Sequence, residues 1–439
     1  MARRQKPPAE APSSPASAPA PSPPPDHAPV APAAPARAAR GLRVAFVADV
    51  HVGVPRWCGG AVEVGLNRRG RMVVKLLRAA VERAHALGCA AFVVCGDLFD
   101  TSAPAPQVVA AVGRALTARQ FPAGVHLLVG NHDMVSDAPG DNAMSPLSLV
   151  EGITVHETPT WVTIDASDDP PDDFRAPHVR RVAQVLMLPF RTGDSKVRLH
   201  EDVAARPSPP DAMACPRLVA MHAGVIDATT PLHLKGAPDA LHLSQVVALA
   251  RAAGASAVFA GNWHDRKVWE VAGDDNGQPV EVVQCGALVP TDFRNPGLDG
   301  YGTLGLWSPE LGATFEVLPG PRFLLAHDRA GFDRAVAAGR TTHSDCALFV
   351  RWTATPQDFP GAVDAMREET TLGVFAGGDV VPLAEAARAD VRAAVTDAQR
   401  PENLRDAAQR YVAGLPDVDD ARRERVLNNV LNYLNLRGA

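Results

Sequence analysis

Short, nearly continuous apolar runs constrain the fold of this chain more than any other feature. LRVAFVAD (42–49), AAFVVC (90–95) and VHLLV (125–129) have strand length and little polar alternation, the pattern of strands covered on both faces. Between them, residues 65–87 and 106–118 carry apolar side chains at helical spacing. The order strand, helix, strand, helix, strand predicts an α/β sheet with helices packed on its faces.

The same pattern continues with shorter elements as far as residue 320. VAQVLMLPF (182–190) and RLVAM (217–221) predict short strands, separated by loops rich in proline and aspartate. A helix over 241–253 leads into a strand at 256–260. We expect the short strands that follow to close an antiparallel portion of the sheet: KVWEVA, VEVVQC, YGTLGLW and TFEVLP.

A separate small unit is predicted after PGPRF (319–323). CALFVRWTA, DFPGAVDAMREE and LGVFAGGDVV, within residues 346–381, have the patterns of a strand, a helix and a strand. Residues 417–436 then place apolar side chains on one helical face, which docks either on its own domain or on a partner. The predicted boundaries are a tail over 1–40, a main α/β domain over 41–320 and a small α/β region with a terminal helix over 321–439.

Composition excludes several classes of protein. With 439 residues, 46% of them hydrophobic, the chain is long enough for two or three domains with sizeable cores. No apolar run approaches the roughly 18 residues of a membrane helix. Six scattered cysteines without a C-x-x-C pair are no disulfide framework and indicate a reducing compartment. We therefore expect a cytoplasmic protein with no membrane contact.

The first 40 residues differ from the rest of the chain. They hold 12 of the 40 prolines and 13 alanines, so we expect an extended, mobile tail and no secretory signal. Five basic and two acidic residues give this tail a charge of +3, so the formal net charge of −6 leaves −9 for the other 399 residues. Such an acidic body does not indicate an intrinsic nucleic-acid binder. Any polyanion has to be held by a local patch, by metal ions or by a partner.

Five polar motifs lie just beyond the predicted strands. In an open α/β sheet, side chains past the carboxyl ends of neighbouring strands converge on one crevice, so these motifs are candidates for one site. Each motif alone is weak evidence, because an isolated histidine is more often structural, as we expect of His85, His126 and His156. The ordered set carries the weight. Its members are Asp49-x-His51, Gly96-Asp97-Leu98-Phe99-Asp100, Gly130-Asn131-His132-Asp133, His222 in AMHAG, and Gly261-Asn262-Trp263-His264.

The donor atoms of these motifs favour divalent metal ions. Carboxylate, imidazole and amide oxygen, without thiolate, form the mixed set that holds Mn²⁺, Fe²⁺ or Zn²⁺. Two such ions roughly 3.5–4 Å apart, bridged by one carboxylate, stabilise the attacking and the leaving oxygens of an in-line phosphoryl displacement. They also lower the pKa of bound water. We therefore expect two divalent ions, with Mn²⁺ as the first choice and Mg²⁺, Fe²⁺ or Zn²⁺ as alternatives, and hydrolysis of a phosphate ester.

The order D-x-H, GDLFD, GNHD, H, G-x-x-H resembles the calcineurin-like metallophosphoesterase superfamily. GDLFDTSAPAP and LLVGNHD are similar in particular to its SbcD-type DNA repair exonucleases. The resemblance covers about residues 42–320, and GNHD is its most specific motif. It implies a four-layered α/β/β/α sandwich with a two-metal site along one edge, followed by a small capping-type α/β domain.

The resemblance also implies a role for each motif residue. His132 would not bind metal but would protonate the leaving oxygen or stabilise the charge of the transition state. Asp100 and Asp133 would orient the residues around the metals, although aspartates that form turns are nearly as common. The implied ligands are Asp49, His51 and His264 for the first ion, Asn131, His222 and Asn262 for the second, and Asp97 as the bridge.

One position departs from the family pattern. The usual motif is G-H-x-H, whereas this chain has Asn262 in place of the first histidine. An amide oxygen can still bind a metal, but it is a harder and usually weaker donor than an imidazole. The second metal is therefore in doubt, while six of the seven implied ligands are present.

Three functions remain open. The favoured one is an SbcD-like nuclease that cuts DNA together with an SbcC-type coiled-coil ATPase. The ATPase has to be a separate partner, because this chain has no G-x-x-x-x-G-K-[ST] loop for ATP hydrolysis. The resemblance leaves a homodimer open as well. The second is a phosphodiesterase or phosphatase for nucleotides or small phosphate esters, which the acidic body favours mildly. The third is a non-catalytic DNA-binding subunit, suggested by Asn262 but disfavoured by the presence of His132 and Asp97.

Overall fold

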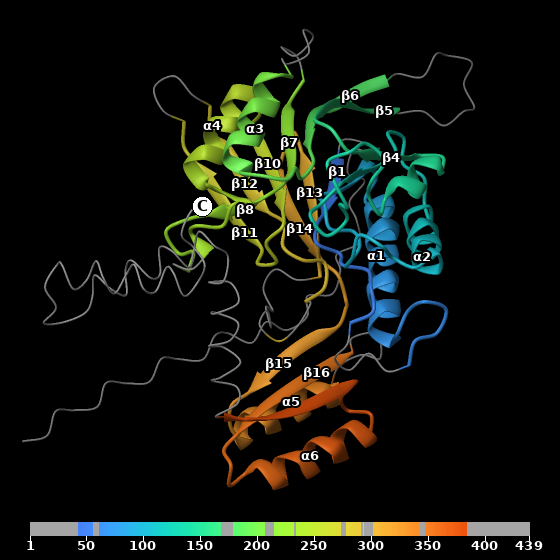
Figure 1. The fold of residues 1–439 in the computed structure, drawn as a ribbon, viewed down its shortest axis with the longest axis vertical. Coiled ribbons are helices and arrows are strands. Elements are labelled where there is room, and N and C mark those ends of the chain that lie inside the picture. Colours follow the sequence, from blue (N-terminus) through green and yellow to red (C-terminus); the bar gives the residue numbers. More distant parts are fainter. Residues whose placement is uncertain are drawn as a thin grey trace, which may run out of the picture. The chain divides into compact units, whose positions relative to one another are not determined.

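Two six-stranded sheets carry the motifs identified above (Figure 1). The computed structural model describes residues 43–55, 61–167, 179–206, 215–231, 234–273, 278–290, 293, 302–341 and 347–383. The first sheet has the order β14-β13-β1-β2-β3-β4 and the second the order β11-β12-β10-β7-β6-β5. Strands of the first sheet are β1 (Arg43–Val47), β2 (Cys89–Val94), β3 (Val125–Leu128), β4 (Ile153–His156), β13 (Thr303–Ser308) and β14 (Gly312–Val317). Strands of the second are β5 (Thr160–Ser167), β6 (Val179–Leu188), β7 (Arg217–His222), β10 (Ala257–Gly261), β11 (Lys267–Val271) and β12 (Val280–Gln284).

Helices cover the outer face of each sheet, which makes four layers. On the first sheet, α1 (Arg68–Ala86) and α2 (Pro106–Leu116) close one buried cluster. On the second sheet, α3 (Ser195–Ala204) and α4 (Leu243–Ala253) close another. A third cluster fills the space between the two sheets. The α/β/β/α sandwich implied by the sequence is confirmed.

Strand β1 shows why its apolar run is continuous. Ala45 and Val47 belong to the cluster under α1, whereas Val44 and Phe46 belong to the cluster between the sheets. The Phe46 ring stacks on Phe259 of the opposite sheet, with 3.8 Å between the ring centroids. Because both faces of the strand are buried, polar alternation would place a polar side chain in one core or the other.

The strand directions bring the motifs to one edge. β1, β2, β3 and β4 run parallel, so their carboxyl ends lie together, and β7 and β10 are parallel neighbours in the second sheet. A two-stranded sheet of β8 (Gly224–Ile226) and β9 (Ala240–His242) follows β7, and a short 3₁₀ helix, η1 (Ser145–Leu149), precedes β4. All five motifs follow or end one of these parallel strands.

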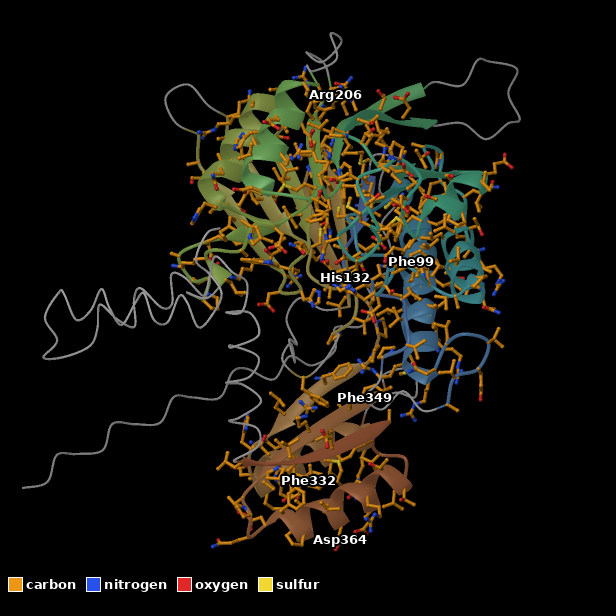
Figure 2. All side chains as sticks on the ribbon, in the orientation of Figure 1. Phe99, His132, Arg206, Phe332, Phe349 and Asp364 are labelled. Carbon is orange, nitrogen blue, oxygen red and sulfur yellow. The ribbon has the colours of Figure 1, made fainter. Side chains whose placement is uncertain are left out.

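A small three-stranded parallel sheet forms the last described part of the chain. Within the unit that spans residues 39–439, it has its own core, in which Phe332 stacks on Trp352 at 4.5 Å and meets Phe375 edge-on at 5.7 Å. Two helices pack on this sheet; Phe332, labelled in Figure 2, lies on the first of them. The elements are β15 (Arg322–Ala326), α5 (Arg329–Thr341), β16 (Leu348–Ala354), α6 (Phe359–Thr371) and β17 (Gly377–Pro382).

Several sequence predictions differ from the structure in detail. The predicted strand over 372–381 is wrong in its first half, because α6 continues to Thr371 and β17 begins at Gly377. The expected single antiparallel portion is divided, since β11 and β12 pair in one sheet and β13 and β14 in the other. The predicted tail over 1–40 and the terminal helix over 417–436 lie outside the described residues. Among the described helices none is long and apolar enough to cross a membrane.

Two buried histidines connect strands β3 and β4. His126 Nε2 lies 2.8 Å from the backbone oxygen of Ala123, and His126 Nδ1 lies 3.1 Å from His156 Nε2. A carbonyl oxygen can only accept, so His126 carries its proton on Nε2 and His156 donates from Nε2 to the free Nδ1. Burial lowers the pKa of His156 to about 3 and also lowers the pKa of His126.

This pair predicts a stability that falls in acid. The folded state keeps His156 neutral below pH 6.5, where the unfolded chain takes up a proton, so stability is lost as the pH falls from about 6.5 towards 3. Between pH 7 and pH 5 we expect this residue to lower the free energy of unfolding by about 2 kcal/mol. In His156→Gln the amide can still donate, and urea unfolding at both pH values should show a smaller loss. Equal losses in the two proteins would contradict this prediction.

Candidate metal centre

The loops after β1 and β2 stay paired beyond the ends of their strands. The backbone N–H of Asp49 donates to the oxygen of Gly96 at 3.1 Å, and that of His51 donates to the oxygen of Asp97 at 3.0 Å. Asp49, His51 and Asp97 all have left-handed backbones, with φ of 49°, 49° and 52°. Residues without glycine's freedom hold this conformation only where their surroundings enforce it, which is a common property of functional sites.

Potential ligand atoms form three overlapping groups. One of them, His51 with Asp100 and His132, includes two exposed residues, and the other two are the ligand clusters described next. In the first, Asp49, His51 and His264 each offer an atom within 4.8 Å of the others, and His51 Nε2 lies 3.1 Å from His264 Nε2. In the second, Asp49, Asp97 and His222 meet the same criterion. Side chains from both sheets therefore face one another across a space that an ion can fill.

Asp97 faces both clusters. Its Oδ1 lies 3.3 Å from His222 Nε2 and its Oδ2 lies 3.6 Å from His51 Nε2. Asn131 joins the second cluster, because its Oδ1 lies 2.8 Å from His222 Nε2. The other nitrogen of His222 is fixed by the backbone oxygen of Cys95 at 2.8 Å, which leaves Nε2 as the atom available to a metal. This geometry is compatible with the bridging role that the family resemblance implies for Asp97, which stays a prediction.

Asp49 provides the strongest local sign that a cation belongs here. Its side chain is fully buried, Oδ1 accepts from the backbone N–H of Asn262 at 2.9 Å, and Oδ2 has no hydrogen-bond partner among the described residues. Burial raises the pKa of Asp49 to about 7, and the charge of Asp97 adds to this rise although His222 opposes it. A buried carboxylate oxygen without a partner is costly unless a cation compensates it. The donor set therefore fits a divalent metal ion.

The other ionisable groups of the centre also have shifted pKa values. Burial lowers the pKa of His51 to about 3, so its imidazole is neutral and can bind a metal through a lone pair. Burial would raise the pKa of Asp97, but the charge and hydrogen bond of His222 hold it well below its usual range. Burial would likewise lower the pKa of His222, yet Asp97 raises it to about 10. Without a cation, the proton of His222 balances Asp97, so a metal has to displace that proton.

His132 lies at the rim of the centre (Figure 2). Its backbone N–H donates to Asp97 Oδ1 at 2.9 Å, and its ring stands edge-on to His51 with 4.8 Å between the centroids. His132 Nδ1 lies 3.2 Å from the backbone oxygen of Asp100, while Asp100 Oδ1 lies 3.6 Å from His51 Nδ1. Asp100 thus lies beside both histidines, and its role in orienting them stays a prediction.

Asp133 ties the second and third motifs together. It is fully buried and accepts backbone N–H groups from Phe99 at 2.8 Å, Gly130 at 3.0 Å and Leu98 at 3.3 Å. A Cβ on Gly130 would lie 2.2 Å from Asp97 Oδ1, so only glycine allows this approach. Burial raises the pKa of Asp133 to about 8 against the effect of these N–H donors. Because its carboxylate holds the backbone of both motif loops, the position of Asp133 is that of a scaffold.

We expect Asp133→Ala to lower the free energy of unfolding by about 3 kcal/mol or more, because three buried N–H groups lose their acceptor. Urea unfolding measures this loss. Asp364→Ala is the matched control, since the Asp364 side chain on α6 is 77% exposed and should contribute within about 0.5 kcal/mol. A loss for Asp133→Ala as small as that of the control would refute the scaffold role.

Asn262 occupies a strained turn after β10. Its φ is 82°, a left-handed value that asparagine tolerates better than most residues, and its Nδ2 donates to the backbone oxygen of Asp239 at 3.0 Å. These contacts suit the alternative in which Asn262 stabilises a turn. Its role as a ligand of the second ion stays a prediction.

The metal-binding behaviour of Asn262 variants separates these alternatives. If the amide oxygen binds the second ion, calorimetric Mn²⁺ titration should show two affinities, and Asn262→His should tighten the weaker one. Asn262→Ala should weaken that same step. Should Asn262→Ala leave both affinities unchanged, Asn262 serves only the turn.

Some groups around the centre could not be predicted from the sequence. The backbone oxygens of Cys95 and Asp239 hold His222 and Asn262, and Gly224 packs against Trp263. Backbone acceptors leave no trace in residue types, so only the two glycine-containing segments, AMHAG and GNWH, offered a signal. Of the described cysteines, Cys89, Cys95 and Cys285 are buried.

Comparisons with known proteins give one family match. Residues 42–192 match the sequence model of the calcineurin-like phosphoesterases. A comparison with curated proteins finds no match. Among solved structures, TT1561 of Thermus thermophilus is 15% identical, covering 63% of this chain and 98% of its own, with a TM-score of 0.37. A dimetal phosphatase from Danio rerio is 14% identical, covering 61% and 92%, with a TM-score of 0.33. A candidate 5'-nucleotidase from Staphylococcus aureus is 14% identical, covering 63% and 53%, with a TM-score of 0.35.

The family match and the ligand clusters both indicate a metal-dependent phosphoesterase. The matched segment holds the first three motifs, and the structure adds His222 and His264 from the second sheet to the same centre. Together they support the calcineurin-like metallophosphoesterase superfamily and a metal-dependent phosphoesterase.

Proposed function

We propose that this chain is a two-metal phosphodiesterase that cleaves DNA, a nuclease of the SbcD type. The observation that carries the proposal is the convergence of carboxylate, imidazole and amide donors from both sheets on one buried carboxylate, Asp97. Asp49, His51 and His264 would hold one ion, and Asn131 and His222 the other, with Asn262 as a further candidate. When bound, the ions supply an activated water and charge stabilisation at the phosphate.

His132 is the residue of this chain that can move a proton. Its Nδ1 faces the backbone oxygen of Asp100 at 3.2 Å, and a carbonyl oxygen can only accept. The proton on Nδ1 is therefore committed. Nε2 is the atom that would donate to a leaving oxygen, and it does so only from the imidazolium form, in which both nitrogens carry a proton. The backbone contact to Asp97 holds the imidazole beside the metal ligands, as general acid catalysis requires.

Two features support DNA as the substrate. GDLFDTSAPAP and LLVGNHD resemble the SbcD-type nucleases, and the three-stranded unit β15–β17 follows the main domain where that family has its capping domain. We extend the proposal to an SbcC-type ATPase as the partner and to the predicted helix over 417–436 as its contact. Mn²⁺ is the metal that we propose, on the grounds of the mixed nitrogen and oxygen donors.

A second candidate is a phosphodiesterase for nucleotides or small phosphate esters. The charge of −9 on residues 41–439 favours it, because an acidic surface repels a long polyanion. The dependence on salt separates the two candidates. At subsaturating DNA concentration, activity on DNA should fall steeply between about 50 and about 200 mM salt, because added salt weakens contacts between the protein and the phosphates. Turnover of a small ester should change little over the same range.

The direct test uses the purified chain with linear DNA and with bis-p-nitrophenyl phosphate. We expect Mn²⁺ to support cleavage of both and a chelator to abolish it. Cleavage of the small ester alone would leave the second candidate. Turnover that survives exhaustive chelation would refute a two-metal enzyme. The absence of turnover with every divalent ion would instead favour the third function, a non-catalytic DNA-binding subunit.

A further inference from the structure

Trp263 lies inside the last metal-binding motif, between Asn262 and His264. A Cβ on Gly224 would lie 2.4 Å from Trp263 Cε2, 2.5 Å from Nε1 and 2.6 Å from Cδ2. Such nearly equal distances to three consecutive ring atoms mean that Gly224 approaches the face of the indole and not its edge. The ring therefore lies flat on the backbone of β8, two residues after His222.

Within the described part of the chain, the N–H of this indole donates no hydrogen bond and its ring has no aromatic or cationic partner. Trp161 and Trp269, which are also half-buried, donate from Nε1 to the backbone oxygen of Arg206 at 3.2 Å and to Asp227 Oδ2 at 3.1 Å. Trp263 makes no such hydrogen bond to any described residue, and no described aromatic ring or guanidinium stacks on it. A tryptophan that served only packing would be expected to be enclosed or to have a partner for its N–H.

The position of the ring relates it to the substrate. Trp263 adjoins His264 of one ligand cluster, and Gly224 beneath it is two residues from His222 of the other. The turn that carries Trp263 therefore borders both ligand clusters. Asn262 fixes the same turn through Asp239, whose backbone oxygen also accepts from Gly224 at 3.0 Å, so the ring is supported from two sides.

We propose that Trp263, backed by Gly224, is a stacking platform for the nucleobase next to the scissile phosphate. This rests on the proposed function and narrows it to substrates that carry a base beside the reacting phosphate. Every base has a π-face, so an indole platform recognises nucleotides without reading their sequence. The base can belong to a DNA strand or to a free nucleotide, and the chemistry of recognition is the same.

The test compares binding with and without the base. In a His132→Ala background with Mn²⁺, a fluorescent single-stranded oligonucleotide with an ordinary terminal nucleotide is compared with the same oligonucleotide that carries an abasic terminal residue. We expect the base to tighten binding by about 5- to 150-fold, the range of one base–aromatic stack. Trp263→Ala should reduce this ratio to about one, and Trp263→Phe should keep most of it.

Two further variants separate stacking from structural damage. Gly224→Ala retains the tryptophan but forces its ring away, so the ratio should fall as it does in Trp263→Ala. Trp269→Phe is the matched control on β11 and should leave the ratio unchanged. Mn²⁺ titration of each variant checks that the centre is intact. A second arm compares adenosine monophosphate with ribose 5-phosphate as competitors, and a base effect confined to this arm assigns the site to free nucleotides.

The outcomes distinguish this inference from the proposed function. A ratio near one in the parent protein, or a ratio that persists in Trp263→Ala, refutes the stacking platform even if the enzyme cleaves phosphodiesters. Lack of cleavage by the wild-type chain refutes the proposed function, while the binding ratio still decides whether a base rests on Trp263.

Discussion

Replacing His132 by alanine is expected to lower phosphodiester turnover by about a hundredfold or more while both metal-binding steps remain. The reason is that the side chain of His132 contacts the backbone oxygen of Asp100 and stands beside His51, whereas its contact to Asp97 comes from the backbone N–H, which alanine retains. The measurement pairs kcat on bis-p-nitrophenyl phosphate with calorimetric Mn²⁺ titration.

A remote histidine is the control for this variant. His327 is exposed at the end of β15, so His327→Ala should keep both turnover and metal binding. If His132→Ala instead lost metal and turnover together, His132 would be a ligand and not a proton donor. Undiminished turnover would show that another group protonates the leaving oxygen.

Asp97→Asn is expected to have the largest effect of any single substitution in the centre. One oxygen of Asp97 faces His222 and the other faces His51, so the neutral amide removes the negative charge that both clusters share and replaces one of the two donor oxygens by an NH₂ group. We expect Mn²⁺ affinity to fall by about a hundredfold or more, since changes outside the ligand shell already cost up to that much. Turnover should fall by about a thousandfold or more, because the metals supply several kcal/mol of stabilisation.

Asp137→Asn is the matched control, because Asp137 contacts Thr192 on the neighbouring surface and belongs to neither ligand cluster. It should retain metal binding and turnover. Retention of both ions with normal affinity by Asp97→Asn would remove Asp97 from the bridging position. Unchanged urea unfolding of Asp97→Asn would show that the loss is local.

The layers of the fold could be predicted because each buried strand carries its own signal. The strands β1, β2 and β3 are buried on both faces, which requires apolar residues at nearly every position. The helices between them have one apolar side. Helix α3 and strand β5 were not predicted, because Ser195–Ala204 is mostly polar and Thr160–Ser167 lies beside a loop rich in aspartate and proline. Their formation depends on packing against β6 and α4, which no local pattern reveals.

The site was predictable in its residue types but not in its supports. Positions just past parallel strands converge for topological reasons, and for this reason Asp49, Asp97 and Asn131 could be grouped from the sequence alone. The left-handed turn at Asn262 and the flat contact of Trp263 on Gly224 depend on backbone geometry between distant segments. The sequence indicates such geometry only where a glycine or an asparagine is required, and it does not show which distant residue makes the contact.

The most direct test of a two-metal centre is a crystal structure of the chain with Mn²⁺, with anomalous diffraction recorded at the manganese edge. We expect two peaks on either side of the Asp97 carboxylate, one bound by Asp49, His51 and His264 and the other by Asn131 and His222. A single peak, or none at saturating Mn²⁺, would contradict a two-metal phosphodiesterase.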